Sequence, residues 1–433
     1  MTTIAGVDVN KLQRNLNEFL KLKIDKNQDL KMLQIMVGRR GELLYNNVYG
    51  EAKEDTIYKI YSMTKCVVSI GLCQLYEKGL FSLNDPLSKF IPAFKDMKVI
   101  MPNPDNTIKK YKTEDAKTEI TCKDILCHTA GFSYGFNFPD ETDQTTSILE
   151  GLYASNKLLQ GNGATGLFGR SCTLEEFTNE LGKMPLLFHP GTKWHYSWAS
   201  QVVGRLIEVL SNMELSEYLD QYIFTPLKMF DTGFTVPKEK QHRLAKNYAF
   251  IAPGKFIDVS DDSGKANDPD NILSTFKSGG EGLTSTCSDY YRFATCLLNG
   301  GILAGTRILS PRTLQWMTSN HLPNQQSTVD MVYDSERYKN IASSEVSLTR
   351  SGFGLGFAIS MESGLDGDMG VSPGSYCWAG AAKTIFWVDP VEEFVVVGMT
   401  QALGAPHYRP NLGNIVYGAI TEMNTTFMRR AKF

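Results

Sequence analysis

A serine and a lysine three residues apart form the first pattern in the chain that could support chemistry. Residues 62–65 read S-M-T-K, and the apolar residues 66–68 follow directly. If a helix begins at Ser62, Lys65 lies one turn deeper on the same face, within reach of the serine hydroxyl. The free amides and the positive end of the helix dipole then surround that hydroxyl. The spacing therefore predicts a serine nucleophile assisted by an amine.

Lys65 stands where the first turn of a helix favours Asp or Glu. We expect burial and the dipole to lower the pKa of Lys65. Neutrality at pH 7 requires that pKa to fall from about 10.4 to about 7, which costs about 4 kcal/mol and is typical of catalytic sites. The structural alternative is a capping serine followed by a lysine that reaches solvent. A second match, Ser274 to Lys277, precedes two glycines rather than an apolar helix, and we interpret it as chance.

Two other motifs compete with this interpretation. Ser133 lies in G-F-S-Y-G, but a nucleophile elbow needs a strand before the serine, and residues 122–128 read as a helix, which favours a structural turn. Residues 161–166 read G-N-G-A-T-G without a preceding strand, which favours a loop over a dinucleotide site. The six histidines form no metal-binding pattern, so we expect no metal site. A serine nucleophile that forms an acyl-enzyme also needs no cofactor.

Tyr196 is the candidate for moving a proton to the leaving oxygen. It ends the segment P-G-T-K-W-H-Y, just before an apolar helix. A phenol has a pKa near 10, and a neighbouring lysine cation makes its phenolate accessible. Taken alone, a tyrosine in an aromatic segment is more often a core residue.

Strands at both ends of the chain and helices between them must position these residues. The expected early elements are a helix over 12–22, a hairpin of 32–37 and 43–49, a strand over 58–61 and a helix over 62–78. Capping pairs Thr121/Asp124, Thr173/Glu176 and Thr286/Asp289 predict helix starts, and 201–210 has helical spacing. The expected late elements are strands over 354–361, 383–388 and 394–400 and a helix over 411–429. This order favours one sheet built from both termini, with a helical insertion.

Composition limits the class of protein. The chain has 433 residues, 42% hydrophobic residues and a net charge of −3, which favours a folded enzyme-sized domain over a nucleic-acid binder. No apolar run reaches the roughly 20 residues of a membrane span. The eight cysteines form no C-x-x-C pair, so we expect buried thiols and a cytoplasmic location.

The polar segments 102–117 and 323–350 are surface excursions or lids. The last three residues match a peroxisomal tripeptide too poorly to count.

The chain resembles the serine β-lactamase and penicillin-binding-protein superfamily. It is most similar to the esterase and acyltransferase branch, which holds the family VIII carboxylesterases and the lovastatin-type acyltransferases. Five motifs carry the resemblance, in family order: residues 61–65 (Y-S-M-T-K), 126–131 (L-C-H-T-A-G), 190–197 (P-G-T-K-W-H-Y-S), 279–283 (G-G-E-G-L) and 378–380 (W-A-G).

The resemblance implies an α/β (α+β) fold with a mixed, mainly antiparallel sheet flanked by helices and a helical subdomain. We expect a single catalytic domain over 10–430, with an α/β part from 10–61 plus 276–430 and a mainly helical part over 62–275. Ser62 is then the acylated nucleophile, Lys65 assists its deprotonation, and Tyr196 acts as general base and then acid. The amides of Ser62 and Ala381 form the oxyanion hole.

Two departures from the β-lactamase pattern concern the substrate. The third motif, Trp378, Ala379 and Gly380, replaces K-T-G or H-x-G, so a tryptophan stands where a cation holds the substrate carboxylate. The second motif has Trp198 where β-lactamases have an asparagine. Both departures favour neutral, apolar small-molecule esters as substrates. The near-neutral charge argues against nucleic acid as a partner, and the lack of a long apolar run argues against a membrane. Acyl transfer, β-lactamase or D-Ala peptidase activity and a silent scaffold stay open as alternatives.

Overall fold

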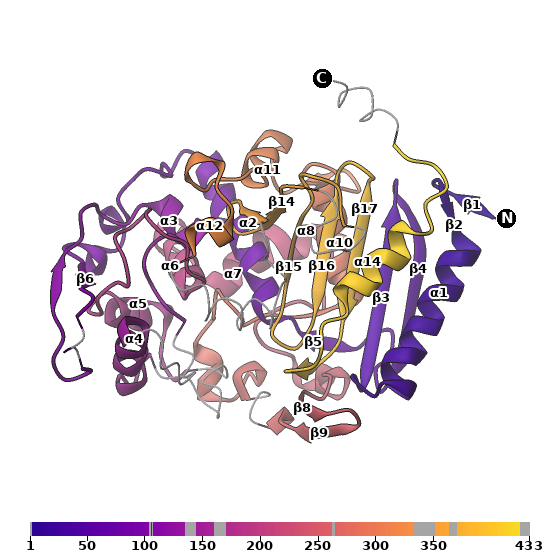
Figure 1. Ribbon diagram of the computed structural model, residues 1–433, viewed down its shortest axis with the longest axis horizontal. Coiled ribbons are helices and arrows are strands. Elements are labelled where there is room, and N and C mark those ends of the chain that lie inside the picture. The colour runs from indigo at the N-terminus through magenta and orange to yellow at the C-terminus, as the bar shows by residue number, and fades with distance from the viewer. Residues whose placement is uncertain are drawn as a thin grey trace.

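One seven-stranded antiparallel sheet is the centre of the fold (Figure 1). The strand order is β13-β14-β15-β16-β17-β3-β4, and each neighbouring pair is antiparallel. The strands are β3 (Met32–Arg39), β4 (Glu42–Gly50), β13 (Ser351–Phe353), β14 (Ala358–Ser360), β15 (Tyr376–Ala379), β16 (Ile385–Asp389) and β17 (Phe394–Met399). The computed structural model describes residues 2–103, 105, 107–134, 144–159, 170–261, 265–332, 351–362 and 370–424.

The two ends of the chain meet in the middle of this sheet. β17 pairs with β3, so that Val396 lies opposite Val37, and both strands are buried along their whole length. Helices α1 (Val9–Lys21) and α14 (Arg409–Tyr417) lie in front of the sheet in Figure 1, and α10 (Cys287–Leu298) packs behind it against β3, β16 and β17. Strands covered on both faces read as continuous apolar runs. The expected mainly antiparallel sheet flanked by helices is confirmed.

Helices fill the other half of the molecule (Figure 1). They are α2 (Thr64–Glu77), α3 (Cys122–Cys127), α4 (Gln144–Ser155), α5 (Leu174–Leu181), α6 (Ala199–Ser211), α7 (Leu215–Leu219) and α8 (Thr225–Leu227). Capping boxes begin α3 at Thr121 and α5 at Thr173, and Thr286 caps α10. The predicted capping pairs are therefore confirmed. The division into subdomains at 61/62 and 275/276 stays a prediction.

Smaller elements tie these layers together. Short strands pair as β5 (Ile57–Lys59) with β10 (Thr284–Thr286), β6 (Lys98–Ile100) with β7 (Thr113–Asp115), β1 (Thr3–Ile4) with β2 (Val7–Asp8), and β11 (Ile302–Leu303) with β12 (Thr306–Arg307). A three-stranded sheet joins β18 (Ala402–Leu403), β8 (Tyr248–Ala252) and β9 (Lys255–Asp258). Helices α11 (Pro311–Met317) and α12 (Thr328–Met331) complete the described α-helices. Part of the polar segment 102–117 is thus strand β7.

Three sequence predictions differ from the structure. The single strand expected over 354–361 is wrong, because the chain turns at Gly356 (φ 92°) and forms β13 and β14 instead. Strand β15 was not predicted. The closing helix ends at Tyr417, where Gly418 is the C-cap, rather than continuing to 429. Residues 333–350, 161–166 and 431–433, which carried further expectations, lie outside the described residues.

All eight cysteines are free and buried, as expected from their apolar surroundings. In the described part of the chain, no helix has the length and apolar character to cross a bilayer.

Candidate active site

Ser62 lies in a single 3-10 turn, Tyr61–Met63, directly before α2. The hydroxyl is buried, with the residue 1% exposed. Two hydrogen bonds fix the turn to the loop before β10: the Ile60 amide donates to the Leu283 carbonyl (3.1 Å), and the Leu283 amide donates to Thr64 Oγ1 (3.1 Å). Tyr61 has a φ of 45°, a conformation that costs a residue with a side chain about 1–2 kcal/mol. The nucleophile candidate therefore sits on a strained, tightly held turn.

Lys65 reaches back to the Ser62 hydroxyl from the first turn of α2. Its Nζ lies 3.0 Å from Ser62 Oγ, 3.2 Å from the Tyr134 hydroxyl and 2.7 Å from the Gly280 carbonyl oxygen. The residue is 2% exposed. The structural alternative of a lysine that extends to solvent is thereby excluded, and the contact expected from the S-x-x-K spacing is present.

Tyr196 joins this pair from the loop before α6. Lys65 Nζ lies 4.8 Å from the Tyr196 ring centroid, which is the distance of a cation–π contact. The Tyr196 ring stacks on Tyr134 at 5.1 Å with 20° between the planes. The structure thus brings Ser62, Lys65 and Tyr196 together in one buried cluster.

His128 holds the Tyr196 loop from the end of α3. Its backbone carbonyl accepts from the His195 amide (3.0 Å), and its Nδ1 accepts from the Ser197 amide (3.2 Å). Burial, with smaller contributions from Lys65 and His195, holds the pKa of His128 well below its usual value. A neutral imidazole with Nδ1 as acceptor carries its proton on Nε2. His128 therefore positions the loop without adding charge beside Lys65.

The end of β15 packs directly on the serine turn. Trp378 and Ala379 are the last residues of the strand, and the Trp378 ring lies 5.5 Å from the Tyr196 ring. A Cβ placed on Gly380 would lie 2.5 Å from the Ile60 carbonyl oxygen, so only glycine permits this approach. Within the described part of the chain, no hydrogen bond from the Ala381 amide is present. This placement is compatible with the expected oxyanion hole.

Sequence reasoning missed two side chains of the cluster, Tyr134 and Glu281. Tyr134 follows the 126–131 motif and was considered only as part of G-x-S-x-G, and Glu281 is the third residue of G-G-E-G-L. The Tyr134 hydroxyl donates to Glu281 Oε2 at 2.9 Å, while its oxygen contacts Lys65. An acidic residue inside a glycine-rich motif was the available signal, but its contact with Tyr134 depends on the tertiary fold.

The rival motifs do not show a comparable arrangement. Ser133 is fully buried and donates to Glu150 Oε1 at 2.9 Å, with His195 Nε2 at 3.4 Å, so its hydroxyl belongs to a structural network. In the second S-x-x-K match, Lys277 Nζ donates to the Ser274 carbonyl rather than to its hydroxyl. Among the residues that the structure describes, no three His, Cys, Asp or Glu side chains gather in a way that could hold a metal ion.

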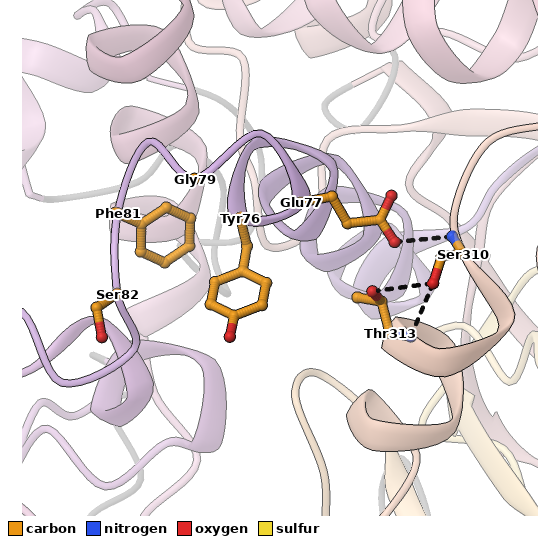
Figure 2. A pocket seen from close by; sticks show the side chains of 7 residues that line it. All are labelled: Tyr76, Glu77, Gly79, Phe81, Ser82, Ser310 and Thr313. Carbon is orange, nitrogen blue, oxygen red and sulfur yellow. Dashed lines mark hydrogen bonds between the residues drawn. The ribbon is translucent and has the colours of Figure 1, made fainter.

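A separate pocket opens at the far end of α2 (Figure 2). Its volume is about 620 Å³, and it lies between the end of α2 and the start of α11. The Ser310 amide donates to Glu77 Oε1 at 2.8 Å across its wall. Its lining is Tyr76, Glu77, Gly79, Phe81, Ser82, Ser310 and Thr313, which includes none of the clustered residues described above.

A buried S-x-x-K serine that packs against the end of β15, an inner strand of an antiparallel sheet, and lies beside a helical half defines a β-lactamase-type protein. The profile of the Beta-lactamase family matches residues 12–416, and the chain belongs to this family. The fold expected from the resemblance is confirmed.

The chain is similar to acyltransferases and an esterase, and also to a putative D-alanyl-D-alanine carboxypeptidase of Salmonella enteritidis. The chain is 27% identical over 371 residues to Acyltransferase calJ of Penicillium decumbens, covering 84% of this chain and 79% of that protein. It is 27% identical over 207 residues to Esterase EstB of Burkholderia gladioli, covering 46% of each. The solved structure of EstCE1, described as a hydrolase with promiscuous acyltransferase activity, superposes with a TM-score of 0.71 at 19% identity, covering 96% of this chain and 99% of that one. The chain therefore stands among the serine hydrolases and acyltransferases of this superfamily.

Proposed function

We propose that this protein hydrolyses small neutral carboxylic esters through an acyl-enzyme on Ser62. The observation that carries the proposal is the buried contact of 3.0 Å between Ser62 Oγ and Lys65 Nζ, with the Tyr196 ring 4.8 Å from the same nitrogen. A serine needs a neighbouring base to become nucleophilic, and this arrangement supplies an amine and a phenol.

The reaction has two halves. In acylation the Ser62 proton passes to the Lys65–Tyr196 pair while Oγ attacks the ester carbonyl, and Tyr196 returns a proton to the departing alkoxide as the C–O bond breaks. In deacylation the pair takes a proton from water, the resulting hydroxide attacks the acyl carbon, and Ser62 Oγ recovers its proton on leaving. The amides of Ser62 and Ala381 stabilise both tetrahedral oxyanions.

Aromatic side chains next to Tyr196 support neutral substrates. Trp378 is 2% exposed and Trp198 4% exposed, and both lie within 7 Å of a tyrosine ring of the cluster, at 5.5 Å from Tyr196 and 6.4 Å from Tyr134. Lys383, the cation that follows the third motif, contacts His407 Nε2 at 3.3 Å. A substrate carboxylate would lack the cation that K-T-G provides, whereas an apolar ester matches aromatic walls.

The test is labelling with a fluorophosphonate probe followed by peptide mapping. We expect the label on the peptide that contains Ser62, and we expect Ser62→Ala to lose both the label and turnover of phenyl acetate. Ser69→Ala, a buried serine two turns further along α2, is the matched control and should keep both. Full turnover by Ser62→Ala would refute the proposal, and an unlabelled, inactive wild-type protein would favour a silent scaffold.

Acyl transfer is the second candidate, favoured by the similarity of the chain to Acyltransferase calJ and by the promiscuous acyltransferase activity described for EstCE1. The two activities differ only in whether water or an alcohol attacks the acyl-enzyme. Adding a small alcohol to the phenyl acetate reaction and measuring the ratio of new ester to free acid discriminates them. Turnover of nitrocefin at enzyme-like rates would instead indicate a β-lactamase.

A further inference from the structure

The buried carboxylate of Glu281 is linked to Lys65 through the hydroxyl oxygen of Tyr134. The Glu281 side chain is 7% exposed, and its Oε2 accepts from the Tyr134 hydroxyl at 2.9 Å. Gln201 Nε2 donates to both carboxylate oxygens at 3.1 Å. The hydrogen-bond donors to this carboxylate therefore include Tyr134, which belongs to the serine cluster, and Gln201, which lies on α6.

Arg170 balances the charge of Glu281 without replacing these hydrogen bonds. Its Nη1 lies 3.8 Å from Glu281 Oε1, which is ion-pair distance but longer than a hydrogen bond. The guanidinium is enclosed by three aromatic rings at 5.1 Å each, those of Phe177, Trp198 and Phe276. Burial lowers the pKa of Arg170, and the charge of Glu281 opposes that effect. Arg170 and Glu281 therefore form a buried ion pair rather than a contact at the protein surface.

Glu281 determines which way the hydrogen bonds around Lys65 can point. A phenol has one proton, and Tyr134 gives it to Glu281, so the Tyr134 oxygen can only accept from Lys65 Nζ. The Gly280 carbonyl can only accept as well. In the base form that the proposed mechanism requires, the Lys65 amine has two N–H bonds and one lone pair. With both N–H bonds directed at these acceptors, the lone pair faces the Ser62 hydroxyl, whose oxygen lies 3.0 Å from Lys65 Nζ.

We infer that Glu281 is a positioning residue, which fixes Tyr134 as an acceptor and thereby aims the Lys65 lone pair at Ser62. The inference rests on the proposed function, because it concerns how the same serine is activated. Without the carboxylate, the Tyr134 hydroxyl is free to donate to Lys65 instead, and the lone pair then turns away from Ser62.

The negative charge of Glu281 also affects how kcat/KM depends on pH. Among the residues that the structure describes, the titratable groups around Lys65 include Tyr134, Tyr196, His128 and Cys66, with Glu281 and Arg170 behind Tyr134. A nearby carboxylate stabilises the protonated form of a base, so its removal moves the acidic limb of kcat/KM to lower pH. A residue that only stabilises the fold would lower activity without moving this limb.

The experiment measures kcat/KM for phenyl acetate against pH, with the product quantified by chromatography. We expect Glu281→Gln to shift the acidic limb by about one pH unit to lower pH and to lower the plateau roughly tenfold. Glu281→Asp keeps the charge but shortens the reach to Tyr134, so the limb should stay while the plateau falls. Glu208→Gln, a carboxylate on α6 that hydrogen-bonds Arg205, is the matched control and should leave both unchanged.

Combining Glu281 and Tyr134 variants tests whether the first acts through the second. Tyr134→Phe removes the acceptor, so adding Glu281→Asp to it should cause no further loss of plateau kcat/KM. This comparison of single and double variants also tests the role of Glu281 if the Glu281→Gln variant fails to fold. Additive losses, or a limb that stays in place in a folded Glu281→Gln enzyme, would overturn the inference. A wild-type protein that neither labels at Ser62 nor turns over ester would instead reject the proposed function beneath it.

Discussion

Gly380→Ala is the most informative single substitution at the junction between β15 and the serine turn. The added Cβ would lie 2.3 Å from Thr384 Oγ1, 2.5 Å from the Ile60 carbonyl oxygen and 3.2 Å from Tyr61 Cβ. The threonine hydroxyl can rotate, but the Ile60 carbonyl belongs to the turn itself. Relief therefore requires the segment that carries the Ala381 amide to move by about 1 Å away from Ser62, since carbon atoms rest at about 3.5 Å or more.

That displacement removes one donor from the proposed oxyanion hole. Loss of such a donor costs about 3 kcal/mol of transition-state stabilisation, or roughly 150-fold in kcat. We expect this loss for phenyl acetate hydrolysis, measured beside the melting temperature of the variant. Gly413→Ala is the matched control, because its Cβ would meet nothing within 4 Å, and a helix gains about 1 kcal/mol from this change. A Gly380→Ala enzyme with native melting temperature and full kcat would refute the reasoning.

Three further predictions concern buried polar groups. Ser133→Ala removes the hydrogen-bond donor to Glu150 and should lower the free energy of unfolding by about 1–3 kcal/mol. Fluorophosphonate labelling of the variant should continue. Loss of labelling in a folded variant would indicate that Ser133 of the G-x-S-x-G motif is the nucleophile. Burial lowers the pKa of Lys59 to about 7, so between pH 7 and 10.5 the native state binds fewer protons than the unfolded state and stability rises with pH. Urea titrations should show this rise, about 1.4 kcal/mol per pH unit, reduced in Lys59→Met, and an equal slope in both proteins would contradict it. Asn247 Nδ2 donates to the Tyr61 hydroxyl at 2.6 Å, so Asn247→Ala should release the strained turn and lower kcat/KM about tenfold, and unchanged kinetics would show that the turn holds without it.

Local patterns predicted the parts of the site that depend on a few neighbouring residues. The three-residue spacing from Ser62 to Lys65 places both groups on one side of a helix start, whatever the rest of the chain does. Capping pairs predicted the starts of α3, α5 and α10 for the same reason, since a hydroxyl and a carboxylate satisfy amides within one turn. Tyr196 became a candidate through its place just before an apolar helix, and the family resemblance assigned it the role of general base.

Contacts between segments far apart in the sequence could not be predicted from such local patterns. Tyr134 and Glu281 meet at Lys65 only because the loops after α3 and before β10 fold against α2, and no short spacing records that contact. Strand β15 was overlooked because its four residues follow a polar stretch and lack alternation. The predicted strand over 354–361 failed at Gly356, whose positive φ turns the chain back on itself.

The pairing of β3 with β17 has a consequence for how the chain is made. β3 ends at Arg39, but the strand that covers its edge begins at Phe394, so a nascent chain carries an open apolar edge through most of its synthesis. Contacts so far apart in sequence slow folding and leave unpaired strands exposed to other chains. The central ladder is completed only after nearly everything else has been translated, so the β3 edge must stay protected from other chains until Phe394–Met399 has been made.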